Sequence, residues 1–311
     1  MPHGHAVRGM LAICAVMGFS KLVWEGTMGS APVMVLSIPY DLAIVSYPRN
    51  RSFLCTTLRS VMHSARPATV TVFHGRRAST PSLQRASQCW LPPSNTTIHE
   101  VVMAPDFGVL DAYFAVTAAV VDGTLPWMQP HHRGLMVVED DVLFEREFDH
   151  SLQVILNQID PHNIVSKPLM LHLYEGLCCG TYHDLARQVN ESSAHGVIRP
   201  ARAEPGWRWG SQAYYFQSIE LLSLLVKHLN ETRHSFVGLQ DMFVWGFGET
   251  HKMPMWAVVG RSLVQHIGAI STLFDSGVRF HASTSFPGSF SEFEGAARWG
   301  DDRHVDSVRD Y

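Results

Sequence analysis

The stretch GLMVVEDDVLF, residues 134–144, decides the fold because it sets three consecutive acids between two apolar runs. Leu135 to Val138 are apolar throughout, as expected for a strand that is covered on both faces of a parallel sheet. Glu139, Asp140 and Asp141 follow at the point where this strand would leave the sheet. Ligands of open α/β sheets bind beyond the carboxyl ends of the strands. We therefore expect a binding site directly after residue 138.

Strand-like and helix-like segments alternate on both sides of this stretch. The patterns predict strands at 33–47, 68–75, 98–104, 134–141 and 167–177, and helices at 52–65, 108–123, 144–160 and in the second half of 207–229. This alternation is typical of an α/β fold with a mostly parallel, Rossmann-like sheet and helices on both faces. The length of 311 residues suffices for one large core or two small ones.

The three acids need an explanation, because ionised carboxylates within one turn repel each other and are costly to bury without a cation. Magnesium and manganese take carboxylate oxygens together with substrate phosphates. The acids are therefore interpreted as a platform for a metal ion and a diphosphate. The alternative is a solvated acidic loop tip.

Composition excludes one class of partner. The formal net charge is −4, from 24 basic and 28 acidic residues, and no long basic run occurs. Nucleic acids require a concentrated positive face, so we expect no nucleic-acid partner.

Three features predict passage through the secretory pathway. An apolar run from Gly9 to Phe19 resembles the core of a signal peptide or a short membrane anchor, with Gly29 to Ala31 as a possible cleavage site; a buried helix is the alternative. Four glycosylation sequons follow, at Asn50, Asn95, Asn190 and Asn230. Outside the apolar run, the cysteines are an even set suited to an oxidising lumen: Cys55, Cys89, Cys178 and Cys179. Their pairing stays open, although a Cys55–Cys89 bridge would close a plausible loop.

Four segments, VVEDDVLF, WGSQAYYF, GLQDMF and VQHIGAIST, occur in this order between residues 137 and 272. In this order and at these spacings they resemble the nucleotide-sugar-dependent glycosyltransferases of the GT-A fold. Among these enzymes the sequence is most similar to the N-acetylglucosaminyltransferase IV family, which branches N-glycans, and to the related Golgi transferase that adds N-acetylgalactosamine to GPI glycans. The resemblance covers roughly residues 33–275. It departs from these relatives in its short amino-terminal apolar run and in the absence of a second long one.

The resemblance implies roles for individual residues. Asp141 and His266 correspond to metal ligands, usually for manganese, and Asp241 to the catalytic base of inverting enzymes. The residues matched to nucleotide contacts are Tyr47, Arg49, Arg51, Glu139, Asp140 and Ser271. An N-cap role is the alternative for Asp241, and a structural role is the alternative for His266. Trp207, Trp209, Tyr214 and Tyr215 could stack on sugar rings, or belong to the core.

The resulting hypothesis is a metal-dependent, inverting glycosyltransferase that moves a sugar, expected to be an N-acetylhexosamine, from a UDP-sugar to an N-glycan or glycolipid acceptor. It would act in the Golgi lumen, membrane-anchored or soluble. We expect a leader or anchor at 1–30, a catalytic domain at 31–275 and a partly ordered tail at 276–311. Two alternatives stay open: a non-catalytic binding protein on the same fold, and a phosphate-ester hydrolase, which would need further His or Asp ligands for a second metal. His131 and His132 lie just upstream of the acids, and a loop role is the alternative for them. The metal hypothesis requires Asp141 and His266 to lie on the same side of the sheet.

Overall fold

The computed structural model describes residues 39–46, 52–76, 85–91, 95–105, 109–129, 133–160, 169–174, 199–202, 212–232, 240–253, 255–259 and 262–267. These ranges all belong to one unit, residues 38–311, and fall within the predicted catalytic domain, 31–275. The predicted leader and the predicted carboxyl-terminal tail lie outside the described residues.

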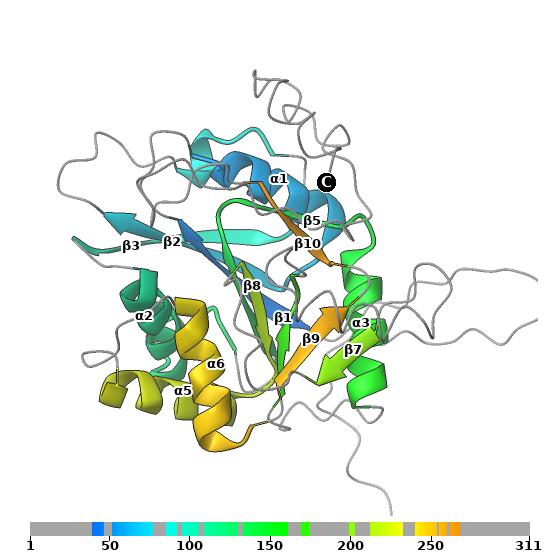
Figure 1. The fold of residues 1–311 in the computed structure, drawn as a ribbon. Coiled ribbons are helices and arrows are strands. Elements are labelled where there is room, and N and C mark those ends of the chain that lie inside the picture. Colours follow the sequence, from blue (N-terminus) through cyan, green and yellow to red (C-terminus); the bar gives the residue numbers. More distant parts are fainter. Residues whose placement is uncertain are drawn as a thin grey trace, which may run out of the picture. The chain divides into compact units, whose positions relative to one another are not determined.

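Within the described residues, eight strands form one sheet in the order β3-β2-β1-β4-β8-β6-β9-β7 (Figure 1). Its strands are β1 (Tyr40–Ser46), β2 (Thr69–Arg76), β3 (Thr97–Pro105), β4 (Gly134–Glu139), β6 (Met170–His172), β7 (Arg199–Arg202), β8 (Ala213–Phe216) and β9 (Met255–Val259). The pairs from β3 to β4 are parallel, as is β6 with β9, whereas β8 is antiparallel to both of its neighbours and β7 is antiparallel to β9. The predicted α/β fold with a mostly parallel, Rossmann-like sheet is confirmed.

Helices cover both faces of this sheet, and the alternation of side chains along the strands shows it. In β1, Leu42 and Ile44 belong to one buried apolar cluster, whereas Ala43 and Val45 belong to the other. The first cluster contains residues of α1 (Leu54–Ser64) and α3 (Phe148–Ile159). The second contains residues of α2 (Val109–Val121), α5 (Ile219–Thr232) and α6 (Gln240–His251), which lie together in Figure 1. Strands apolar on both faces are the expected result of this double cover.

The segment that follows the acids differs from the sequence-based prediction. The predicted helix at 144–160 begins only at Phe148, because residues 142–144 form a short strand, β5 (Val142–Phe144). This strand pairs antiparallel with β10 (Val264–His266) in a separate two-stranded sheet. The pairing provides backbone hydrogen bonds that a helix turn would otherwise provide. A local apolar pattern could not reveal a partner strand about 120 residues away.

The aromatic residues of β8 belong to the core. Tyr214, Tyr215 and Phe216 are fully buried, and their rings alternate between the two apolar clusters. Tyr214 and Tyr215 therefore have the core role that was the alternative to sugar stacking. Trp207 and Trp209 lie outside the described residues.

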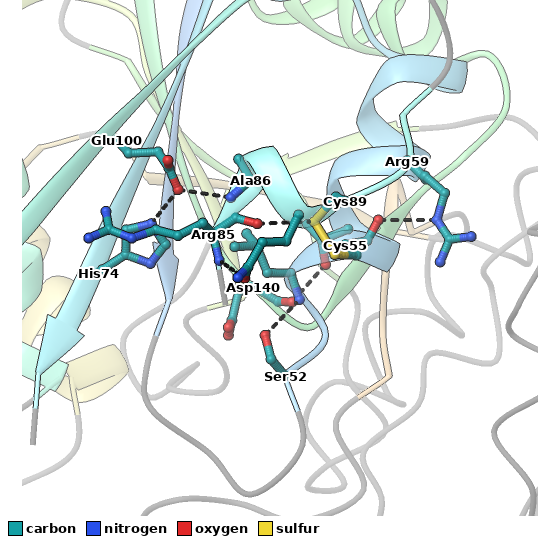
Figure 2. Close-up of a disulfide and its surroundings, with 12 residues drawn as sticks. Ser52, Cys55, Arg59, His74, Arg85, Ala86, Cys89, Glu100 and Asp140 are labelled. Carbon is teal, nitrogen blue, oxygen red and sulfur yellow. Dashed lines mark hydrogen bonds and ion pairs between the residues drawn. A yellow bond between two sulfur atoms is a disulfide. The ribbon is translucent and has the colours of Figure 1, made fainter. Parts of the chain in front are cut away.

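A disulfide fixes the beginning of α1. Cys55 in α1 is bonded to Cys89, which follows the short 3₁₀ turn at Ala86–Gln88 (Figure 2). The same turn is held to the sheet by Glu100 of β3, which accepts the N–H of Ala86 at 2.8 Å and lies 2.9 Å from His74 Nε2. Burial lowers the pKa of His74, so this imidazole is neutral at physiological pH. The disulfide and these polar contacts together link α1, through the 3₁₀ turn, to strands β2 and β3.

Among the described helices, none combines the length and apolar character needed to span a bilayer. The apolar run at Gly9 to Phe19 lies outside the described residues.

Candidate metal and nucleotide site

The site lies where the order of the strands reverses. From β1 the chain adds β2 and β3 on one side, and then crosses to β4 on the other side of β1. The carboxyl ends of the parallel strands β1 and β4 are therefore neighbours. In open α/β sheets such a switch point is the usual location of a ligand crevice. The acidic motif occupies this point.

The acids follow the last hydrogen bonds of β4. The N–H of Glu139 donates to the carbonyl of Gln212, and the N–H of Asp140 donates to the carbonyl of Val45, both at 3.1 Å. A turn at Asp140–Asp141 then leads directly into β5. The motif is thus anchored to both neighbouring strands. Glu139 is half-buried, whereas Asp140 and Asp141 are 0% and 2% exposed.

Hydroxyl groups from two other elements hold Asp140. The Ser46 hydroxyl, at the end of β1, donates to Asp140 Oδ2 at 2.7 Å. The Thr57 hydroxyl, in the first turns of α1, donates to the Asp140 carbonyl at 2.8 Å and accepts the N–H of Val142 at 3.2 Å. These contacts fix the turn that carries the acids. Ser46 and Thr57 are positioning residues that the sequence analysis did not identify. The polar residue that ends an apolar strand was the available signal for Ser46.

His266 reaches the acids through the small sheet. The β10–β5 ladder pairs His266 with Val142, and the N–H of Ile267 donates to the Asp141 carbonyl at 2.8 Å. This register brings His266 Nε2 to 3.1 Å from Asp141 Oδ2, across 125 residues of sequence. The two residues lie on the same side of the sheet, as the metal hypothesis requires.

Glu139, Asp141 and His266 form a group whose candidate ligand atoms all lie within 4.8 Å of one another. Two carboxylates and one imidazole suit a divalent ion such as manganese, which accepts oxygen and nitrogen ligands. The buried phenol of Tyr174 is close enough to sense these acids: burial raises its pKa, and the charges of Asp141 and Glu139 raise it further. The effect on Tyr174 shows that the two acids create a negative potential in a buried part of the protein, and such a potential favours a bound cation.

The group differs in one detail from the roles implied by the resemblance. Asp141 and His266 were the expected metal ligands, and Glu139 was expected at the nucleotide; the structure places Glu139 with the metal-ligand candidates and Asp140 with Ser46. Strand alternation does not predict this choice, because Asp140 and Asp141 lie in a turn beyond the end of β4.

The remaining predicted site residues are not placed by the structure. Asp241 is the second residue of α6, inside the helix and not preceding it as an N-cap would, and its side chain lies outside the described part. The following residues lie outside the described ranges: Tyr47, Arg49, Arg51, His131, His132 and Ser271. Their roles stay predictions.

Comparison with known proteins adds no family assignment. No protein-family model matches the chain, and no curated protein sequence matches it significantly.

Proposed function

We propose that this protein is a metal-dependent glycosyltransferase that transfers a sugar from a UDP-sugar to a glycan acceptor. The observation that carries the proposal is the convergence of Glu139, Asp141 and His266 at the switch point of a Rossmann-like sheet. The chemistry of transfer from a UDP-sugar requires charge stabilisation on the leaving diphosphate. A bound manganese or magnesium ion would supply it as a Lewis acid.

The residues themselves have distinct tasks in this proposal. Asp141 and His266 would hold the cation, and Glu139 would add a second carboxylate to the same group. Asp140 serves the nucleotide side of the site, with Ser46 and Thr57 fixing the turn. Because the turn is anchored by buried hydrogen bonds, its carboxylates do not have to reorganise when the ligand binds.

Deprotonation of the acceptor hydroxyl requires a carboxylate within hydrogen-bond reach. We assign this task to Asp241, in line with the resemblance to inverting enzymes. Tyr47, Arg49, Arg51 and Ser271 complete the proposed nucleotide contacts.

A location in the secretory pathway, with the Golgi lumen as the expected compartment, belongs to the same proposal. Its support is the Cys55–Cys89 disulfide and the exposure of the two described sequon residues, Asn95 and Asn230. Disulfides persist in oxidising compartments, and sequons are modified at exposed positions. The sequence alone left the pairing of the cysteines open, and the structure pairs Cys55 with Cys89.

The test is calorimetric titration of the purified lumenal chain with UDP, with and without manganese. We expect manganese-dependent binding by the wild type and its loss, by at least about 100-fold, in Asp141→Ala, because removal of a metal ligand weakens the diphosphate platform. Asp122→Ala is the matched control, since Asp122 is an exposed acid beyond α2. Equal manganese-dependent binding by Asp141→Ala would refute the proposal.

Activity is tested separately, by incubating the wild type with UDP-N-acetylhexosamines and N-glycan or glycolipid acceptors. Binding without transfer in every combination would favour a non-catalytic sugar or nucleotide receptor. Release of inorganic phosphate from phosphate esters, without glycosyl transfer, would favour the hydrolase alternative.

A further inference from the structure

Two imidazoles face each other across the contact between α5 and α6. His228 of α5 and His251 of α6 place Nδ1 and Nε2, respectively, 3.4 Å apart. His228 is 9% exposed, whereas His251 is exposed at the surface. Their rings are nearly perpendicular, at 82°, and Phe247 contacts both rings. The His228 side of this pair is thus buried, whereas the His251 side lies at the surface.

The distance between the two nitrogens matches a chelated ion. Ligand nitrogens in a tetrahedral zinc site lie about 2.0–2.1 Å from the metal, which places any two of them about 3.3–3.4 Å apart. The observed distance between the two nitrogens, 3.4 Å, agrees with this separation. It exceeds the roughly 2.9–3.0 Å between donor and acceptor in a typical hydrogen bond from an N–H group. The spacing therefore suits a shared cation better than a shared proton.

Burial lowers the pKa of His228, and the neighbouring His251 lowers it further, against an opposing effect of Glu231. Glu231 is exposed on the same helix and contributes a negative potential that attracts cations.

We propose that His228 and His251 form a two-imidazole site for a divalent transition-metal ion of the zinc type, with water completing its coordination. Imidazole ligands favour zinc, nickel and copper over manganese and magnesium, so this site selects ions that differ from those proposed for the acids. It shares no residue with Glu139, Asp141 and His266, and it does not depend on the proposed function. In the described residues the acids are the one group with three or more candidate ligands, so the histidine site offers two protein ligands.

A bound ion would cross-link two helices that otherwise meet through side-chain packing. Because α6 also carries Asp241 in its first turn, the ion would hold this helix against α5. Metal binding to the folded chain stabilises it by mass action. The expected consequence is a more rigid α5–α6 pair when zinc is bound.

The experiment is calorimetric titration of zinc into the full chain, comparing the wild type with His251→Ala and His251→Phe. The phenylalanine variant keeps an aromatic ring against Phe247 but has no ligand nitrogen. His63→Ala is the matched control, because His63 is an exposed histidine on α1. The chain has 18 histidines, so the informative quantity is the difference between variants. We expect both His251 variants to bind one zinc equivalent fewer, and the control to bind as the wild type does.

Thermal unfolding supplies the second measurement. Zinc should raise the midpoint temperature of the wild type by roughly 2–5 °C, and the part of this rise that depends on His251 should disappear in both His251 variants. Asp141→Asn should retain it, which separates this site from the acidic one. Equal zinc stoichiometry and equal thermal shifts in the wild type and in His251→Phe would overturn the proposal.

Discussion

Asp41 lies near the amino end of β1 and Asp141 just beyond the carboxyl end of the neighbouring strand β4, and the surroundings of these two buried acids differ completely. Asp41, near the amino end of β1, is 1% exposed and accepts hydrogen bonds from Thr69 Oγ1 at 2.7 Å and from the N–H of Gln129 at 2.8 Å. Arg133 lies 3.2 Å away and is always positively charged. Asp141, just beyond the carboxyl end of β4, is similarly buried. It lies near another acid and beside His266, which is charged only when protonated.

This difference is the reason why we interpret Asp41 as a structural acid and propose a metal-binding role for Asp141. At the amino end of β1, hydrogen-bond donors and the positive charge of Arg133 compensate the charge of Asp41 within the fold. At the carboxyl edge, the chain gathers Glu139 and Asp141 within reach of one another, which costs free energy in the absence of a cation. A bound cation would stabilise this arrangement, which is why we propose a metal ion at these residues.

The largest effect is expected from Asp41→Asn. Removing this charge leaves the Arg133 guanidinium without its buried partner and should lower the free energy of unfolding by about 2–4 kcal/mol, less than for a fully buried pair because Arg133 is 25% exposed. Manganese-dependent UDP binding should persist. Urea denaturation measures the change, with Asp122→Asn as the control for an exposed acid. A loss below about 1 kcal/mol would show that Asp41 is not a structural acid.

Asp141→Asn should have little effect on the stability of the metal-free protein but should remove most of its stabilisation by manganese. Without metal its free energy of unfolding should stay within about 1 kcal/mol of the wild type, since one like charge is removed from the acid group. Manganese at about 100 times its dissociation constant should stabilise the wild type by about 2.7 kcal/mol and the variant by little. Denaturation with and without manganese gives both quantities. Equal stabilisation of the two proteins would contradict the comparison.

His172 provides a third case for this comparison, because burial is the cause of its pKa shift. Burial lowers its pKa from 6.5 to about 3. Between these values the unfolded chain binds more protons, so this contribution to stability is fully present above pH 6.5 and is lost as the pH falls. The loss should reach about 2 kcal/mol at pH 5. In His172→Leu, urea denaturation between pH 7.5 and pH 5 should show a correspondingly shallower pH dependence; an unchanged slope would exclude His172 as its source.

The smallest effect is expected from His266→Ala. The carboxylates of Glu139 and Asp141 would remain, so manganese affinity should fall by about tenfold, or roughly 1.4 kcal/mol, and not vanish. His150→Ala, at an exposed position of α3, is the control. Calorimetric titration with manganese in the presence of UDP measures the affinity. An unchanged affinity would place His266 in a structural role and leave the carboxylates as the metal ligands.

The first half of the fold could be predicted from the sequence, because each element there has a strong local pattern. The strands β1 to β4 are apolar runs with β-branched residues, separated by helices α1 and α2 at the expected positions. The short strands β5, β7 and β10 have three or four residues each. Segments this short become strands only by pairing with other strands, so their sequence patterns do not predict them.

The sequence by itself determined that an apolar strand ends in three acids and that a histidine follows an apolar segment 125 residues later. The tertiary structure decided which acids meet this histidine. The β5–β10 register brings His266 to Asp141, and the hydroxyls of Ser46 and Thr57 hold Asp140 apart from that group. Local patterns arise from neighbouring residues, whereas this choice depends on hydrogen bonds between segments that only folding brings together.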